Sequence, residues 1–396
     1  MINRTIFNML EGEITRPEVI VLLGPRQVGK TTILKMLQAK IQKTHKRTAY
    51  FDLEQPGVLA EFNQPEAALV EYLRDAGGIL FIDEFQYVGN ISKIFKAIFD
   101  SGKKVKIFCS GSSALEIHTH LKESLAGRRF LYRVYPLEYN ELINGVAHFT
   151  LDEYLIFGGM PGLLSADSSA RKIQILNELL SAYILKDIKS LVKEENIRAF
   201  NHLLYLLAQN QGALISVNSL SSEIGLSAKA IARYLDILEQ TYVNFRVLSF
   251  SENLGNELKK SCKTYLFDLG VRNALLKDFS AMNAREDQGN ILETAVFLKL
   301  QAQLAPNEEI KFWRTKDGAE VDFILVRNRK PIPIEVKSKL AERSVPSGLR
   351  RFLVRYPHTK NAYVVSKNVE GVSMVEGCRI TFVLLSSFLS GVIIPD

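Results

Sequence analysis

A short stretch near the amino terminus predicts a phosphate-binding loop, and it limits the folds that this chain can adopt. Residues 19–32 have the sequence VIVLLGPRQVGKTT, in which an apolar run of strand length leads directly into Gly-x-x-x-x-Gly-Lys-Thr. A helical pattern of apolar residues follows as far as Ile41. A strand, a glycine-containing loop and a helix in this order indicate backbone amides that surround a phosphate group. The alternative, a glycine turn with a surface lysine, does not account for both the spacing and the context.

The residue types within the loop fit this chemistry. Gly24 and Gly29 can adopt backbone angles that are closed to other residues. Lys30 can reach the β- and γ-phosphates of a nucleotide, and the hydroxyl group of Thr31 can hold Mg²⁺. We therefore expect ATP and Mg²⁺ as cofactors, with a nucleotide-binding set of Gly24, Pro25, Arg26, Gln27, Val28, Gly29, Lys30, Thr31 and Thr32.

Length and composition indicate a folded protein of several domains. At 396 residues the chain exceeds one ordinary hydrophobic core, which predicts two to four domains. No run of about 18 apolar residues is present, so we expect no membrane partner. Glu11 and Glu13 argue against an export signal. Three widely separated cysteines are typical of a reducing cytoplasm, which is the predicted location: Cys109, Cys262 and Cys378.

The positive charge of the chain is concentrated in one segment. The net charge is +7, and residues 311–360 contain 13 Lys and Arg against 5 Asp and Glu, a local balance of +8 that leaves −1 for the remainder. A basic segment of this kind suits a nucleic-acid partner such as DNA. A solvated basic face without a partner is the alternative, and charge alone does not choose between them.

A second apolar run predicts another strand of the domain that carries the phosphate-binding loop. Residues 78–84 have the sequence GILFIDE, typical of a buried strand that ends in two carboxylates. Asp83 is expected to hold the Mg²⁺ shell, and Glu84 to polarise the attacking water. Ser110 or Ser112, at the end of the next strand, could orient that water. Ordinary turn chemistry is the alternative for the two serines.

The stretch LAGRRF at residues 125–130 precedes a further strand and supplies a candidate arginine finger. Arg128 or Arg129 could stabilise the charge on the departing γ-phosphate, while a salt bridge at the start of a strand is the alternative for either residue. Strands that alternate with helices over this region predict an α/β fold with a doubly wound parallel sheet. The nucleotide is then expected at the carboxyl ends of the strands.

The middle of the chain predicts helices followed by a winged-helix pattern. Helices are expected from residue 151 to 211, broken at the stretch GGMPG (158–162) and including an amphipathic run over 182–188. Residues 215–240 predict two helices separated by a turn, and residues 242–263 a strand and a polar loop that would form a wing. Such a unit binds the DNA major groove in many proteins and docks proteins in others, and both alternatives stay open.

The last third predicts a site built from three acids and a lysine. Glu293 lies near the start of a helix, and Asp322 lies in the following strand pattern. Glu335 and Lys337 are two residues apart on another strand, so they share a face. Carboxylates that converge in this way can hold Mg²⁺ through oxygen ligands, and Lys337 can position a water molecule for attack on phosphorus. Salt-bridged strand residues are the alternative.

The chain resembles the prokaryotic AAA+-type ATPases that end in a domain of unknown function. The resemblance rests on the phosphate loop, on Asp83 and Glu84, and on three further stretches, LAGR (125–128), GGMP (158–161) and GAEVDF (318–323). It implies a P-loop domain, a winged helix and a PD-(D/E)xK nuclease-like domain. Catalytic roles would follow for Lys30, Glu84, Arg128, Asp322, Glu335 and Lys337, and metal-binding roles for Thr31, Asp83, Glu293, Asp322 and Glu335.

These expectations combine into four predicted domains and a leading function. We expect the ATPase domain at residues 1–147, a helical lid at 148–211, a winged helix at 212–264 and a nuclease-like domain at 265–396. The predicted function is ATP hydrolysis coupled to action on nucleic acid. Two alternatives are a nucleotide-dependent switch with an inactive carboxyl-terminal domain, and a DNA-binding regulator. A finger that acts on a neighbour's ATP would require a homo-oligomer.

Overall fold

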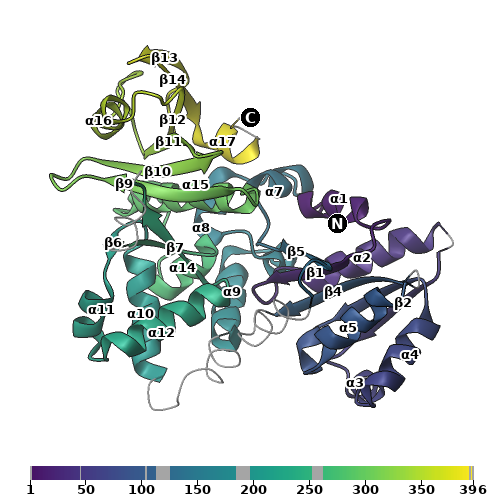
Figure 1. Ribbon diagram of the computed structural model, residues 1–396. Coiled ribbons are helices and arrows are strands. Elements are labelled where there is room, and N and C mark those ends of the chain that lie inside the picture. Colours follow the sequence, from purple (N-terminus) through teal and green to yellow (C-terminus); the bar gives the residue numbers. More distant parts are fainter. Residues whose placement is uncertain are drawn as a thin grey trace. The chain divides into compact units, whose positions relative to one another are not determined.

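A computed structural model describes residues 2–44, 46–102, 105–112, 125–183, 197–251, 262–391 and 394 (Figure 1). These residues form two compact units, one of residues 1–137 with 240–243 and one of residues 138–239 with 244–396. Most of the amphipathic run predicted over 182–188 and most of the predicted wing loop lie outside the described residues.

The first unit, as far as the structure describes it, is built around a parallel sheet with the strand order β2-β3-β4-β1-β5. This confirms the predicted α/β class and parallel sheet. In chain order its elements are α1 (Thr5–Gly12), β1 (Val19–Gly24), α2 (Lys30–Gln42), β2 (Thr48–Asp52), α3 (Pro56–Phe62), α4 (Glu66–Ala76), β3 (Ile79–Asp83), η1 (Phe85–Tyr87), α5 (Ile91–Asp100), β4 (Lys106–Ser112) and β5 (Arg129–Arg133).

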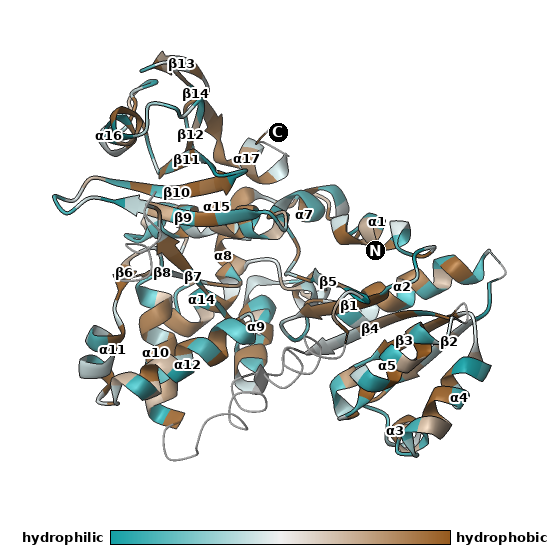
Figure 2. Cartoon of the chain, in the orientation of Figure 1, coloured by the Kyte–Doolittle hydropathy of each residue, from teal (hydrophilic) through white to brown (hydrophobic). Residues whose placement is uncertain are grey.

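Burial explains why this sheet is parallel and central. Every residue of β1 and β3 is buried, as expected for strands that helices cover on both faces. Helix α2 packs against β1, β3 and β4, and α5 crosses in front of the sheet in Figure 1. Figure 2 shows hydrophobic and hydrophilic residues side by side on α5, as expected for a helix with one face on the sheet.

The second unit begins with helices. In chain order its first elements are α7 (Tyr139–Gly145), α8 (Leu151–Phe157), η2 (Pro161–Ser165), α9 (Ser169–Tyr183), α10 (Ile197–Gln209), β6 (Leu214–Ile215), α11 (Val217–Ile224), α12 (Ala228–Gln240), β7 (Asn244–Ser249) and β8 (Cys262–Leu266). The remaining elements are α14 (Leu269–Leu276), η5 (Met282–Ala284), α15 (Gln288–Gln303), β9 (Glu308–Arg314), β10 (Glu320–Arg327), β11 (Lys330–Lys337), α16 (Ser347–Arg355), β12 (Asn361–Ser366), β13 (Gly371–Val375), β14 (Cys378–Leu384) and α17 (Leu385–Ser390).

One mixed sheet runs through most of the second unit. In the described residues, its strands follow the order β13-β14-β12-β11-β10-β9-β7-β8-β6. Strand β7 is the junction, because it pairs antiparallel with β8 and parallel with β9. Strand β8 crosses residues 264 and 265, so the domain boundary predicted between them falls inside a strand of a continuous sheet.

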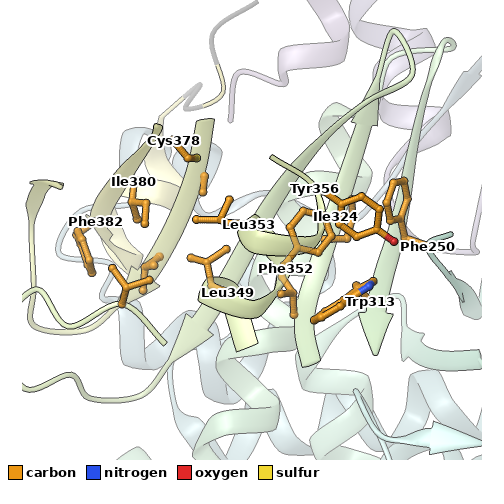
Figure 3. Close-up of a cluster of buried hydrophobic side chains, with 14 of the residues drawn as sticks. Phe250, Trp313, Ile324, Leu349, Phe352, Leu353, Tyr356, Cys378, Ile380 and Phe382 are labelled. Carbon is orange, nitrogen blue, oxygen red and sulfur yellow. The ribbon is translucent and has the colours of Figure 1, made fainter. Parts of the chain in front are cut away.

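A hydrophobic cluster fixes α16 against this sheet (Figure 3). Phe352 of α16 packs edge-on against Trp313 of β9, with ring centroids 5.3 Å apart. The backbone is close here as well, because a Cβ atom on Gly348 would lie 1.9 Å from the carbonyl oxygen of Glu320. Helix α16 therefore begins directly over β10, the strand that carries Asp322.

Candidate functional sites

The loop between β1 and α2 has the backbone geometry that its sequence predicts. Gln27 and Gly29 have positive φ angles of 61° and 95°, and α2 begins at Lys30. Gly24 ends β1 against the backbone after β5, where a Cβ atom would lie 2.1 Å from the carbonyl oxygen of Val134. The amides of the first helical turn have no partner within the helix, so they can donate to a phosphate group.

Lys30 is held inside this loop. Its side chain is buried, and Nζ donates to the carbonyl oxygens of Gly24 at 2.9 Å and of Pro25 at 2.8 Å. Thr31 is half-buried and Thr32 is exposed in the same helical turn. The ammonium group therefore lies inside the loop, where it could contact the phosphate groups of a nucleotide.

Asp83 ends β3 as a buried carboxylate with two hydroxyl donors. The Tyr50 hydroxyl donates to Oδ2 at 2.8 Å, and the Ser110 hydroxyl donates to Oδ1. The donors come from β2 and β4, the two strands on either side of β3. Ser110 therefore orients Asp83 itself. Burial and the Asp83 charge raise the pKa of Tyr50, which keeps its hydroxyl protonated as a donor.

Glu84 follows Asp83 in a left-handed conformation. Its φ and ψ angles are 53° and 47°, and its Oε2 atom accepts a hydrogen bond from Gln86. A residue other than glycine in this region costs about 1 kcal/mol or more, and such residues cluster at functional sites. The turn lies against the end of β4, since a Cβ atom on Gly111 would be 2.8 Å from Phe85. The left-handed conformation at Glu84 turns the chain away from the direction of β3.

Two contributors to this site were not predicted from the sequence. Arg4 is buried, and its guanidinium group donates to the carbonyl oxygens of Val28 at 3.0 Å and of Tyr135 at 2.7 Å. It thus ties the phosphate loop to the segment after β5. Tyr50 is the other. Arg4 and Tyr50 both reach partners that are far away in the sequence, so no local pattern marked either residue.

The structure does not bring Arg128 together with the phosphate loop of its own chain. The Arg128 carbonyl accepts a hydrogen bond from Val19, the first residue of β1, whereas the phosphate loop follows the last residue of that strand. The Arg128 side chain pairs with Asp100 at 2.7 Å. Arg129 lies opposite Val19 in the sheet. The alternative of a salt bridge at a strand start therefore describes Arg128 within one chain.

The predicted acids of the second unit lie close together on three elements. Glu293 lies on α15, Asp322 on β10 and Glu335 on β11. Asp322 Oδ2 accepts a hydrogen bond from the backbone amide of Val336 at 2.8 Å. Glu335 is buried and pairs through Oε1 with Lys337 Nζ at 2.6 Å, on the same face of the strand as predicted.

Lys263 of β8 stands among these acids and was not predicted. Its side chain is 1% exposed, and Nζ lies 3.0 Å from Glu293, 2.6 Å from Glu320 and 3.9 Å from Asp322. Burial alone would lower the pKa of Lys263, but these three acids raise it above its ordinary value. The group is therefore a charged ammonium. The sequence had placed it at the end of a wing loop.

The three carboxylates that were predicted to bind a metal ion have other partners in the structure. No group of three or more His, Cys, Asp or Glu side chains in the described part of the chain is arranged to hold a metal ion. Glu293 is engaged instead by Lys263 and by the Tyr265 hydroxyl, which donates to the same oxygen at 2.6 Å. Burial, and next the Asp322 charge, raise the pKa of both Glu293 and Glu335. Asp322 and Glu335 remain as the carboxylate pair.

The glycines at 158 and 159 surround a buried aspartate. Asp268 accepts hydrogen bonds from the backbone amides of Gly159 at 2.8 Å and of Val271 at 2.9 Å, the latter at the start of α14. A Cβ atom on Gly158 would lie 2.3 Å from the Asp268 carboxylate. The stretch that was predicted only to break two helices thus joins α8 to α14 through Asp268.

The helices predicted at residues 215–240 have the predicted inner and outer faces. Ile231, Leu235 and Leu238 are buried in α12, while Lys229 and Arg233 are exposed. Arg246 of β7 pairs with Asp236 at 2.8 Å and also with Glu239. None of the described helices is long and apolar enough to cross a bilayer.

Comparison with known proteins divides the chain into three matched segments. Residues 16–143 match the AAA domain family, whose match contains the phosphate loop, Asp83 and Glu84. Residues 16–143 are therefore similar to AAA domains. Residues 148–281 and 288–385 match two domains of unknown function, DUF8612 and DUF4143.

Similar proteins occur in bacteria and archaea. An uncharacterized protein of Mycobacterium tuberculosis is 26% identical over 348 residues, covering 87% of this chain and 76% of that protein. One from Methanocaldococcus jannaschii is 26% identical over 404 residues, covering 95% and 87%. Among solved structures, the Walker-type ATPase of Pyrococcus abyssi is 16% identical and covers 70% of this chain and 96% of that chain, with a TM-score of 0.49.

Proposed function

We propose that this protein hydrolyses ATP in its first unit and uses the nucleotide state to control a second unit that acts on nucleic acid. The observation that carries the ATPase part is Lys30, held by two loop carbonyls beside the amino end of α2. Asp83 is the last residue of β3 and is buried, and Glu84 follows it in a left-handed conformation. A loop, an ammonium and two acids are the parts that phosphoryl transfer to water requires.

The chain's own groups have separate roles in this proposal. The loop amides and Lys30 bind the phosphates, and Glu84 accepts a proton from the attacking water. Mg²⁺, when bound, would be held by Thr31 and Asp83 and would neutralise charge on the β- and γ-oxygens. The donor set fits such an ion, because Asp83 is buried and fixed by two hydroxyl groups.

Nucleic acid is the proposed partner of the second unit on two grounds. Helices α11 and α12 with strands β6, β7 and β8 follow the order of a winged helix, and α12 exposes Lys229 and Arg233. The basic segment adds Arg350, Arg351 and Arg355, all exposed on α16. Because α16 begins over β10, this face adjoins the Asp322 strand.

We further propose that Asp322, Glu335 and Lys337 form a nuclease-like site. The Oε2 atom of Glu335 is buried and has no hydrogen-bond partner among the described residues, so this oxygen could serve as a cation ligand. Mg²⁺ commonly binds to one or two carboxylates together with substrate phosphates, so Asp322 and Glu335 could hold it. The ion would polarise the phosphate, and Lys337 would orient water.

One observation favours the alternative function, a nucleotide-dependent switch with a second unit that binds but does not cut. Lys263 occupies the space among the acids and removes Glu293 from the ligand set. In that case ATP turnover would change affinity for a partner and no phosphodiester would be cleaved.

We also propose that Arg128 acts on the ATP of a neighbouring copy in a homo-oligomer. It lies at the end of β1 remote from its own phosphate loop, and its side chain is 32% exposed. Mass measurements with and without ATP test this proposal, and Arg128→Ala should lower turnover only under conditions of assembly.

The test combines ATPase and cleavage assays on duplex, single-stranded and branched DNA. Lys30→Ala should abolish phosphate release, by about a thousandfold or more. DNA should stimulate the wild-type protein. Metal-dependent cutting that Asp322→Asn and Lys337→Ala both remove would establish the nuclease, whereas stimulation without cutting would favour the switch. ATP hydrolysis that survives Lys30→Ala would overturn the proposal.

A further inference from the structure

Lys263 has an unusual position for a lysine side chain. It lies on β8, a strand paired on both sides, opposite Leu214 of β6 and Val247 of β7. Its ammonium group lies 5.7 Å from the ring centroid of Phe312. A buried lysine persists as a cation only where acids compensate the lost hydration. Strand pairing on both sides therefore fixes the backbone of Lys263, and its ammonium group is held close to the acids.

The contacts of Lys263 separate the acids into two groups. Nζ lies 3.0 Å from Glu293 and 2.6 Å from Glu320, but 3.9 Å from Asp322. Tyr265 shares a strand face with Lys263 and donates to the same Glu293 oxygen at 2.6 Å. Lys263 is thus in close contact with Glu293 and Glu320 and forms a longer ion pair with Asp322.

The backbone at Gly212 packs closely against the Glu293 carboxylate. Gly212 has a φ angle of +74°, and a Cβ atom built on it would lie 2.8 Å from Glu293 Oε1 and 3.1 Å from Oε2. Backbone therefore closes one side of the carboxylate, and Lys263 and Tyr265 hold the other. Glu293 is built as a ligand for an ammonium group.

We infer that Lys263 is a fixed cation in the position a divalent ion would take between Glu293 and Asp322, so that the second unit binds at most one such ion. That single ion would belong to Asp322 and Glu335, and in this respect the inference rests on the proposed function. An ammonium 3.9 Å from Asp322 repels a second dication at the same acids. Lys263 is then a determinant of metal stoichiometry, and it takes no part in the reaction.

The test counts Mn²⁺ ions by electron paramagnetic resonance and calorimetry on the full chain without nucleotide. Every protein carries Asp83→Asn, so that ions bound in the first unit are not counted. The variants are Lys263→Met, which removes the charge at similar length, Lys263→Gln, which keeps a hydrogen-bond donor, and Lys263→Arg, which keeps the charge. Circular dichroism confirms that each variant is folded, and Lys263→Gln stands in if Lys263→Met does not fold.

The inference predicts one ion for the protein that retains Lys263 and for Lys263→Arg, and one additional ion for Lys263→Met and Lys263→Gln. The additional ion should bind at least tenfold more tightly than any second ion binds to the protein that retains Lys263. Two ions bound to the protein that retains Lys263, or no additional ion in either neutral variant, would overturn it.

The same counts separate this inference from the proposed metal site. No ion with Lys263 present and one in the neutral variants would support the fixed cation and refute the pair of Asp322 and Glu335 as a sufficient site. One ion in every protein would refute the fixed cation alone. No ion in any protein would refute both.

Discussion

The phosphate loop of the first unit and the acidic site of the second unit are assembled in opposite ways. The loop is a contiguous stretch, and the groups proposed to bind phosphate are its backbone amides and one lysine from the same turn. The acidic site draws charged side chains from β8, α15, β10 and β11, which span more than seventy residues of sequence from Lys263 to Lys337. A contiguous site depends on local conformation, whereas a dispersed site depends on the sheet that brings its strands together.

This difference explains why one site is visible in the sequence and the other only in part. Gly29 and Lys30 meet because they are neighbours. Lys263 meets Glu293 and Glu320 because β8 and β10 belong to the same sheet and α15 packs on it. Contacts that a chain makes through tertiary structure leave no spacing rule in the sequence.

The largest expected effect tests whether chemistry in the local site can be removed without changing its shape. Glu84→Gln keeps the size of the side chain and removes the base, so ATP should still bind while hydrolysis falls by about a hundredfold or more. Single-turnover assays with ATP-binding measurements check this. Glu61→Gln, at an exposed acid of the same unit, is the matched control. Loss of ATP binding in Glu84→Gln would assign Glu84 to the shape of the loop.

The second effect tests how strongly the stability of the second unit depends on one buried acid, Asp268, which joins segments that are distant in the sequence. Burial raises the pKa of Asp268 to about 6, although hydrogen bonds from Gly159 and Val271 oppose the shift. The folded protein then holds this proton more tightly than the unfolded chain does. The stability due to neutral Asp268 is present below about pH 4 and is lost as pH rises through about 6.

Asp268→Asn removes this pH dependence. Between pH 4 and 7 the free energy of unfolding of the wild-type protein should therefore fall relative to that of Asp268→Asn, by at most about 3 kcal/mol. Urea unfolding at several pH values measures the difference. Asp152→Asn removes an exposed carboxylate of α8 and is the control. A constant difference between Asp268→Asn and wild type across this range would contradict the assignment.

The third effect tests whether the phosphate loop depends on local sequence alone. Arg4 contacts the loop from a position that is distant in the sequence. Arg4→Met removes the hydrogen bonds to Val28 and Tyr135, and we expect the ATP dissociation constant to rise about tenfold. Titration with a fluorescent ATP analogue measures it. Arg16→Met, at a side chain that is 59% exposed, should leave affinity unchanged. Equal affinities for both variants would show that the loop holds its shape without Arg4.

The smallest effect concerns the donor to Asp83. Tyr50→Phe removes one of the two hydroxyl groups that donate to the Asp83 carboxylate. We expect hydrolysis to slow by about threefold to tenfold and the free energy of unfolding to change by no more than about 1 kcal/mol. Steady-state rates over a series of Mg²⁺ concentrations test this. Tyr72→Phe, which loses a hydrogen bond to Glu61 on the surface, should behave as wild type.

Local patterns in the sequence were sufficient for the parallel sheet, the loop and the shared face of Glu335 and Lys337. Each follows from backbone periodicity within a few residues. The roles of Lys263, Arg4 and Asp268 could not be predicted, because each depends on which strands or helices become neighbours. Arg128 illustrates the same limit. The sequence predicts that it precedes a strand, but it does not say which end of β1 lies beside the start of that strand.

The pairing of β7 with both β8 and β9 has a consequence for dissecting the protein. A truncation between residues 264 and 265 would cut β8 and expose open sheet edges on both fragments, which promotes aggregation. The helices before the cut and the strands after it should therefore melt in a single cooperative transition, and neither half should be recoverable as a soluble product of limited proteolysis.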